Sequence, residues 1–172
     1  MRWLTPHLCV ESVLDISVER LRSLNIQWLL LDVDSTLKRY REEMPGTAIM
    51  TWVSRIRAEG IGVCLFSNGG TQRIGLIAEK LGVPFVSKAC KPLPLRCGTA
   101  IQYLKASWDQ TALVGDQIFA DVLAGRLAGL LTILVRPMHP EDEPRYTRIK
   151  RPLETRLLRR FFQDSSQGML NL

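Results

Sequence analysis

Two acidic side chains, Asp32 and Asp34, directly follow an apolar run and are the first candidates for chemistry in this chain. The run, residues 27–33, has the composition of a buried strand, and side chains two apart on a strand point to the same face. Two carboxylates placed in this way repel each other and are costly to bury without a partner. A cation would resolve the conflict, and an all-oxygen ligand set favours Mg²⁺. The alternative is that one aspartate caps a turn while the other is solvated.

A serine and flexible backbone follow the second apolar run, residues 61–66, in the segment Ser67-Asn68-Gly69-Gly70. A hydroxyl group and backbone N–H groups beside a helix N-terminus can hold a phosphate. Taken alone, the same segment could be a plain turn.

A further pair of acids, Asp116 and Asp121, follows the apolar run 111–114. Gly115 lets the backbone approach its neighbours closely. Asp121 falls on the first turns of the next helix and faces back toward the strand ends. Capping of that helix by Asp116 is the alternative role.

Two lysines, Lys88 and Lys91, lie between these segments, and either could neutralise phosphate oxygens and hold the aspartates apart. Lys91 is favoured because Pro92 stiffens the backbone after it and can begin a helix. A surface lysine is the alternative.

The elements that must position these residues alternate between strands and helices. The expected strands are 27–33, 61–66, 84–86, 111–114 and 131–135, and the helices between them are 45–59, 71–81, 94–105 and 118–128. This alternation implies a parallel sheet covered on both faces, in a three-layer, doubly wound α/β fold. Such sheets bind ligands beyond the carboxyl ends of their strands. Because the candidate residues follow strands, we expect them to meet at that edge.

Length and composition favour one domain over residues 1–172, with 46% hydrophobic residues to build its core. The core is expected at about 25–136, with an N-terminal helical segment at 10–24, whose helix runs from about Val18 to Leu24, and a basic tail over 137–172. Ser17 is a candidate N-cap for that helix. The four cysteines lack a Cys-x-x-Cys pair and a companion histidine cluster, which disfavours a structural zinc site.

Charge and hydropathy indicate where the protein works. No apolar run approaches the roughly 18 residues of a spanning helix, and the first residues lack the pattern of a secretory signal. We therefore expect a cytoplasmic protein, or one that is peripheral on a membrane. The net charge of +6 favours anionic partners such as lipid headgroups, nucleic acid or phosphorylated substrates.

Taken in chain order, these motifs resemble the four motifs of the haloacid dehalogenase (HAD) superfamily of phosphatases. The residues that carry the resemblance are Asp32, Asp34 and Thr36 for the first motif, Ser67 for the second, Lys91 for the third, and Gly115, Asp116 and Asp121 for the fourth. More narrowly, Lys91-Pro92 and the runs 115–125 and 131–135 resemble YqeG-type members of subfamily IIIA. These members are relatives of the mitochondrial and plastid phosphatidylglycerophosphate phosphatases.

The resemblance implies a Rossmann-like fold and a two-step mechanism with Mg²⁺ as cofactor. Asp32 would attack phosphorus and form an aspartyl-phosphate, while Asp34 would move protons to and from the reacting oxygens. Mg²⁺ would be held by the Asp32 carboxylate, the Asp34 backbone carbonyl and Asp116, with Asp121 in or near this set.

The remaining motif residues are expected at the substrate phosphate. Ser67 and Lys91 would bind the phosphoryl oxygens, with Asn68 beside them, and Thr36 would orient the loop and assist. Ser35 stands where many relatives have asparagine, and two glycines replace a more polar continuation after Asn68; both departures could alter substrate preference.

The spacing between the motifs leaves no room for a separate cap domain, so the site should be capless and open. An open site can hydrolyse a phosphate group that is carried by a large molecule or surface. The tail offers a clue, because residues 145–160 contain seven arginines or lysines and one glutamate. As a helix, it would gather its leucines and phenylalanines on one side and Arg156, Arg159 and Arg160 on the other, with Glu154 spoiling the apolar side. Such a helix could lie on an anionic membrane surface, or it could pack its apolar side on the sheet.

The leading expectation is therefore a phosphatidylglycerophosphate phosphatase that contacts an anionic lipid headgroup. Phosphorylated nucleic-acid ends or phosphoproteins are alternative substrates. Nucleic acid ranks lower because no interleaved aromatics suggest a base-stacking platform. A catalytically silent interaction module is the third possibility, although such relatives usually lose an acid that this chain retains.

Overall fold

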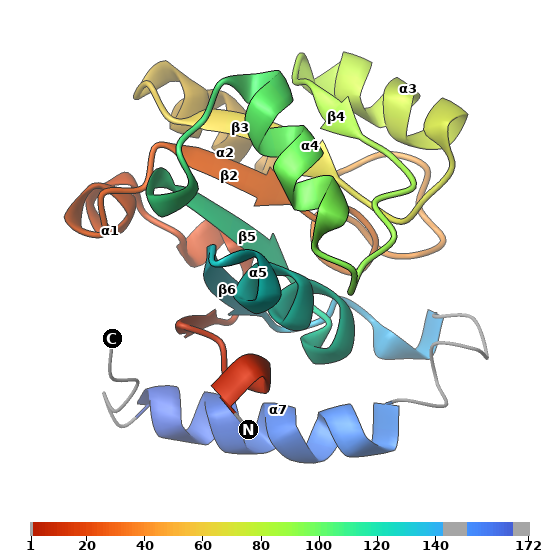
Figure 1. The fold of residues 1–172 in the computed structure, drawn as a ribbon. Coiled ribbons are helices and arrows are strands. Elements are labelled where there is room, and N and C mark those ends of the chain that lie inside the picture. Colours follow the sequence, from red (N-terminus) through yellow and green to blue (C-terminus); the bar gives the residue numbers. More distant parts are fainter. Residues whose placement is uncertain (1, 143–150, 167–172) are drawn as a thin grey trace.

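A computed structural model describes residues 2–142 and 151–166 and contains a six-stranded parallel sheet (Figure 1). Its strands are β1 (Leu8–Val10), β2 (Trp28–Leu31), β3 (Gly62–Phe66), β4 (Phe85–Val86), β5 (Thr111–Gly115) and β6 (Leu131–Val135). Their order across the sheet is β1-β6-β5-β2-β3-β4, and all five pairings are parallel. The predicted doubly wound α/β fold is confirmed.

The strand order reverses between β2 and β5, in the middle of the sheet. From β2 the chain adds β3 and β4 on one side, and it then returns to place β5 and β6 on the other. In open α/β sheets the crevice at such a reversal is where ligands bind. Asp32 follows β2 and Asp116 follows β5, so the two aspartates flank this crevice.

The helices cover both faces of the sheet (Figure 1). Their bounds are α1 (Val18–Ser23), α2 (Thr47–Ala58), α3 (Thr71–Leu81), α4 (Leu95–Leu104), α5 (Leu123–Ala128) and α7 (Arg151–Ser166), and a π-helical turn, η4 (Ile118–Val122), leads into α5. Side chains of β2 alternate between the two layers: Leu29 and Leu31 pack with α2 and α3, whereas Leu30 packs with α4 and α5.

The N-terminal segment differs from its prediction. Residues 8–10 form an edge strand that pairs with β6, so the sheet has one more strand than the sequence indicated. The helix expected from about Val18 to Leu24 is present as α1, and Ser17 is its N-cap, as proposed. A three-residue strand shows too little periodicity to be recognised, and its place depends on β6, far away in the chain.

Helix α7 packs its apolar side on the protein. Leu158, Phe161 and Phe162 are buried against η4 and β6, while the three arginines of the opposite side are exposed. The apolar side is thus covered by the core, which is the packing alternative for this helix. Glu154 is also buried, and its carboxylate accepts a hydrogen bond from the Phe119 backbone N–H at 3.1 Å. The parts of the predicted tail at 143–150 and 167–172 lie outside the described residues.

The connections above the carboxyl ends of the strands are short. Residues 32–46 join β2 to α2 through turns, residues 67–70 join β3 to α3, and neither connection holds an inserted domain. None of the helices in the described part of the chain combines the length and hydrophobicity of a membrane span.

Candidate active site

A cavity of about 170 Å³ lies at the carboxyl ends of the central strands. It is lined by residues from four of the predicted motif segments and from two further segments: Asp32, Asp34, Ser35, Tyr40, Ser67, Asn68, Gly69, Arg73, Lys91, Gln117, Ala120 and Asp121. The edge of the sheet that the sequence indicated is therefore hollowed.

Three buried carboxylates form an acid cluster beside this cavity: Asp32, Asp116 and Asp121. Each offers an oxygen atom, and these oxygens all lie within 4.8 Å of one another. Asp32 follows β2, Asp116 follows β5, and Asp121 lies in η4. The chain thus brings carboxylates from two strand ends and one helical turn to a single point.

Lys91 is the cation of the acid cluster. Its Nζ atom donates to Asp32 Oδ1 and Asp121 Oδ1, both at 2.6 Å, and to the Phe66 carbonyl oxygen at 3.0 Å. An ammonium group has three N–H donors, so all three are used. Lys91, the lysine favoured from the sequence, is buried, whereas Lys88 is exposed.

Local contacts fix these side chains in place. The Asn68 side-chain amide forms two hydrogen bonds with the Lys91 backbone, accepting from its N–H at 2.8 Å and donating to its carbonyl at 3.1 Å. Asp121 Oδ2 accepts from the Gln117 N–H at 3.0 Å. A Cβ atom at Gly115 would lie 2.2 Å from the Asp121 carboxyl carbon, so only glycine leaves room for that carboxylate.

Charge at the acid cluster is suited to a divalent cation. Three carboxylates against one ammonium leave a surplus of two negative charges, which Mg²⁺ would neutralise with oxygen ligands. Burial raises the pKa of Asp32 to about 7; Lys91 opposes this shift, and the nearby Asp121 acts in the same direction as burial. Burial alone would lower the pKa of Lys91, but the Asp121 and Asp32 carboxylates raise it above its ordinary value. The residues present fit a divalent metal.

Asp34 lies outside the acid cluster and is held by two cations, in a group that we name the Asp34 clamp. Lys38 Nζ donates to Asp34 Oδ1 at 2.9 Å, and the Arg73 guanidinium donates to both carboxylate oxygens at 2.7 and 2.6 Å. Burial would raise the pKa of Asp34, but hydrogen bonds from Arg73 and Lys38 lower it below the ordinary value. The Asp34 side chain is therefore not a ligand of the cluster, and any contribution to a metal would come from its backbone carbonyl.

Lys38 and Arg73 were not predicted from the sequence. The Lys38 side chain is only 1% exposed, which is rare for lysine and requires the Asp34 partner. Its i+4 spacing from Asp34 is a weak signal outside a helix. Arg73 lies in the first turn of α3 and carries no sequence signal, because its partner is 39 residues away.

The three residues predicted at the substrate phosphate besides Lys91 lie in or next to the cavity. Thr36 is buried and does not line the cavity; its hydroxyl donates to Asp116 Oδ1 at 3.3 Å and lies 3.5 Å from Asp32 Oδ2. It is placed to orient the carboxylates. Asn68 lines the cavity, but its amide is used to hold Lys91. Ser67 also lines the cavity, and its Oγ accepts from the Gly69 N–H at 3.2 Å, which leaves its O–H free to rotate toward a ligand.

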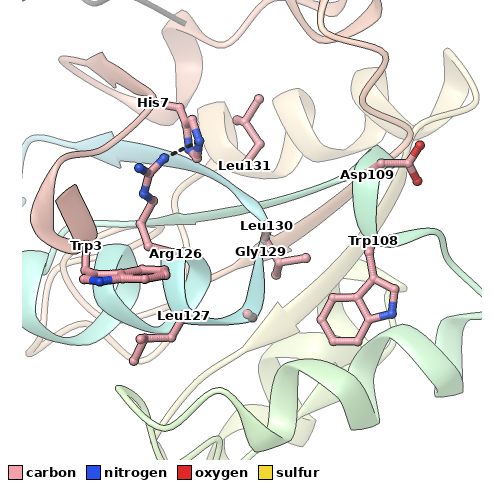
Figure 2. A pocket seen from close by; sticks show the side chains of 10 residues that line it. Trp3, His7, Trp108, Asp109, Arg126, Leu127, Gly129, Leu130 and Leu131 are labelled. Carbon is pink, nitrogen blue, oxygen red and sulfur yellow. Dashed lines mark hydrogen bonds between the residues drawn. The ribbon is translucent and has the colours of Figure 1, made fainter.

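A larger cavity of about 520 Å³ lies at the opposite, amino-terminal ends of the strands (Figure 2). Trp3, Trp108 and Leu127 surround it, and Arg126 is hydrogen-bonded to His7 on one side. Its acidic lining residue is Asp109 alone, and burial lowers the pKa of His7 below its ordinary value. A cavity without clustered carboxylates cannot hold a divalent metal for phosphate chemistry, so the smaller cavity is the candidate active site.

Comparisons with known proteins agree with this geometry. A HAD-hydrolase-like family model matches residues 89–141. Over 157 residues the chain is 31% identical to the probable phosphatase YqeG of Bacillus subtilis, and the alignment covers 91% of each protein. It is 22% identical over 171 residues to phosphatidylglycerophosphate phosphatase 1 (chloroplastic/mitochondrial) of Arabidopsis thaliana, covering 94% of this chain and 49% of that protein.

Solved structures share the fold. The cobalt-bound deoxy-D-mannose-octulosonate 8-phosphate phosphatase of Haemophilus influenzae superposes with a TM-score of 0.54 at 17% identity, over 64% of this chain and 68% of that one. The corresponding 3-deoxy-D-manno-octulosonate 8-phosphate phosphatase of Yersinia pestis gives 0.54 at 16% identity, over 73% and 72%. The chain therefore belongs to the HAD superfamily of phosphatases. Within that superfamily its resemblance to the YqeG type, expected from the motifs, is confirmed.

Proposed function

We propose that this phosphatase is Mg²⁺-dependent, acts through an aspartyl-phosphate on Asp32, and hydrolyses phosphatidylglycerophosphate to phosphatidylglycerol. The observation that carries the chemistry is the acid cluster, in which a buried carboxylate faces a cavity next to two further carboxylates and a lysine. Support for the lipid comes from the name of the Arabidopsis relative and from the capless, open approach to the cavity.

The reaction has two steps. In the first, an Asp32 oxygen forms a bond to phosphorus as the ester P–O bond breaks, and the leaving alcohol oxygen takes a proton from Asp34. Because Lys38 and Arg73 lower the pKa of Asp34, this step requires that Asp34 is released from at least one of these cations and protonated when substrate is bound. In the second, Asp34 takes a proton from water, whose oxygen bonds to phosphorus while the Asp32–phosphorus bond breaks. Inorganic phosphate and the free alcohol are the products, and Asp32 is regenerated.

The side chains of the cavity, and a bound metal, would stabilise charge in both steps. Mg²⁺ would be held by Asp32, Asp116 and Asp121, and would neutralise charge that develops on the phosphoryl oxygens. Ser67 is placed to donate its hydroxyl hydrogen to one of these oxygens. All three Lys91 donors are used by the protein, so its binding to a phosphoryl oxygen requires release from one of its three acceptors.

Purified protein should release phosphate from phosphatidylglycerophosphate in mixed micelles when Mg²⁺ is present and lose this activity in EDTA. An end-phosphorylated oligonucleotide and a phosphopeptide form parallel arms of the assay. Activity on either of these that exceeds activity on the lipid would overturn the lipid assignment. Metal-independent hydrolysis would overturn the assignment of Mg²⁺.

A further inference from the structure

A cavity of about 480 Å³, which we name the second cavity, adjoins the candidate active site at the Asp34 clamp. Both cavities are lined by Tyr40 and Arg73, so these two side chains form a junction between them. Beyond the junction the wall contains Met44 and Leu76, which are 39% and 53% exposed. Large apolar side chains at such exposure, next to a reactive site, are candidates for contact with a substrate.

Arg73 carries unused binding capacity at this junction. A guanidinium has five N–H donors, of which Asp34 accepts two, and the Arg73 side chain is 43% exposed. Lys38 and Arg73 together oppose a single carboxylate, so the Asp34 clamp carries a surplus of one positive charge. That charge faces the approach to the acid cluster, whose surplus has the opposite sign.

Gly69 makes this position of Arg73 possible. A Cβ atom at Gly69 would lie 2.4 Å from the Arg73 Nη2 atom, so any other residue would displace the guanidinium. Gly69 therefore controls the position of the residue at the junction.

Besides Arg73, the charged residues in the lining of the second cavity are one arginine and two glutamates. Arg41 pairs with Asp142 at 3.2 Å, Glu42 accepts from the Arg39 N–H at 3.1 Å, and Glu43 and Gln72 complete the wall. Because Arg41 is paired with Asp142, the positive charge available to an anion belongs to Arg73, and the surface available to an apolar group belongs to Met44 and Leu76.

From these observations we infer that the second cavity binds the leaving group of the substrate, an alcohol that carries its own anionic phosphodiester and an apolar chain. Arg73 donates to the phosphodiester oxygens, and the start of the chain lies against Tyr40, Met44 and Leu76. This inference rests on the proposed lipid substrate and adds residues that select for it. A small aryl phosphate reaches the acid cluster without contacting Met44 or Leu76.

Leu76→Asp tests the apolar wall without touching the reacting groups. We expect it to raise KM for phosphatidylglycerophosphate about tenfold or more while changing kcat and KM for an aryl phosphate by less than about twofold. Leu127→Asp is the matched control, because Leu127 is an exposed leucine at the other end of the sheet. It should leave both substrates unchanged.

Arg73→Gln and Gly69→Ala test the anion contact. Both should lower kcat/KM for the lipid more than for the aryl phosphate, by a further factor of about ten to a hundred for Arg73→Gln, because one charge-assisted hydrogen-bonding group is lost. Unchanged ratios in Leu76→Asp and Arg73→Gln, in a protein that hydrolyses the lipid, would overturn the inference and leave the proposed function intact. Failure of the unsubstituted protein to hydrolyse the lipid, with aryl phosphate still hydrolysed, would overturn the lipid assignment itself.

Discussion

Asp32 and Asp34 are two residues apart, yet they belong to groups of opposite charge. In the acid cluster, Asp32 meets two carboxylates and one lysine, and its burial raises its pKa to about 7. In the Asp34 clamp, one carboxylate meets two cations, whose hydrogen bonds outweigh burial and lower its pKa. Both side chains follow the same strand, so the difference in their pKa values comes from neighbours that belong to other elements.

This contrast shows how one cavity can serve a metal and an anion together. The cluster side has surplus negative charge and suits a divalent cation, while the clamp side has surplus positive charge and suits a substrate oxygen. A phosphate monoester bound between them would meet complementary charge on both sides.

The largest expected effect comes from removing the acid cluster's nucleophile. Asp32→Asn should reduce kcat for an aryl phosphate by at least about a thousandfold, because the amide cannot form the aspartyl-phosphate. Thermal unfolding should show no loss of stability, since one of three mutually repelling carboxylates becomes neutral. Retention of more than a tenth of the activity in a folded variant would contradict the role of Asp32.

On the clamp side, Lys38→Met should destabilise the fold by about 2–4 kcal/mol, because Asp34 would lose its buried partner and keep only the more exposed Arg73. The free energy of unfolding in urea measures this change. Lys80→Met, at an exposed position of α3, serves as the control and should shift it by less than about 0.5 kcal/mol. Equal changes in the free energy of unfolding for the two substitutions would show that the contact between Lys38 and Asp34 does not stabilise the fold.

The raised pKa of Asp32 predicts a pH dependence of the protein's stability. Its folded pKa is raised to about 7 from 3.8, so its contribution to stability is present below pH 3.8 and is lost as pH rises through about 7. The lowered pKa of His7 acts in the opposite direction near pH 6.5. We therefore expect that, without metal, the Tm of the unsubstituted protein falls relative to the Tm of Asp32→Asn as the pH is raised from 5 to 8.

Metal binding should show the same titration. Because Mg²⁺ must displace the Asp32 proton, the association constant measured by calorimetry should rise by up to about tenfold per pH unit below pH 7 and level off above it. A pH-independent association constant between pH 5 and 8 would separate Asp32 from the metal.

The smallest expected effect concerns a fourth buried carboxylate, Glu154. It accepts from the Phe119 N–H in η4, the turn that also holds Asp121. Glu154→Gln keeps an acceptor but loses its charge, and should cost about 0.5–1.5 kcal/mol in the free energy of unfolding, with kcat within about twofold. A tenfold fall in kcat would show that α7 helps to position the acid cluster.

The parts of this account that were predictable from the sequence share a physical cause. Continuous apolar strands imply a parallel sheet, and a parallel sheet gathers strand ends at one edge, so Asp32 and Asp116 were expected to meet. Asp121 followed from helical spacing, and Pro92 favoured Lys91 over Lys88. These inferences use local pattern and sheet topology only.

The parts that were not predictable depend on contacts between distant segments. Arg73 reaches Asp34 because Gly69 leaves space for its guanidinium, and the local sequence around Arg73 does not predict this contact. Strand β1 is defined by its pairing with β6 rather than by its own three residues. Glu154 was expected to spoil an apolar helix face, but a backbone N–H more than thirty residues away compensates its burial.

The most direct test of the central claim is acid quenching of the Mg²⁺-loaded protein during turnover of an aryl phosphate, followed by peptide mass spectrometry. The account predicts a phosphoryl group on Asp32, absent from Asp32→Asn and absent when EDTA replaces Mg²⁺. Hydrolysis that proceeds with no phosphorylated peptide, or with the phosphoryl group on another residue, would contradict it.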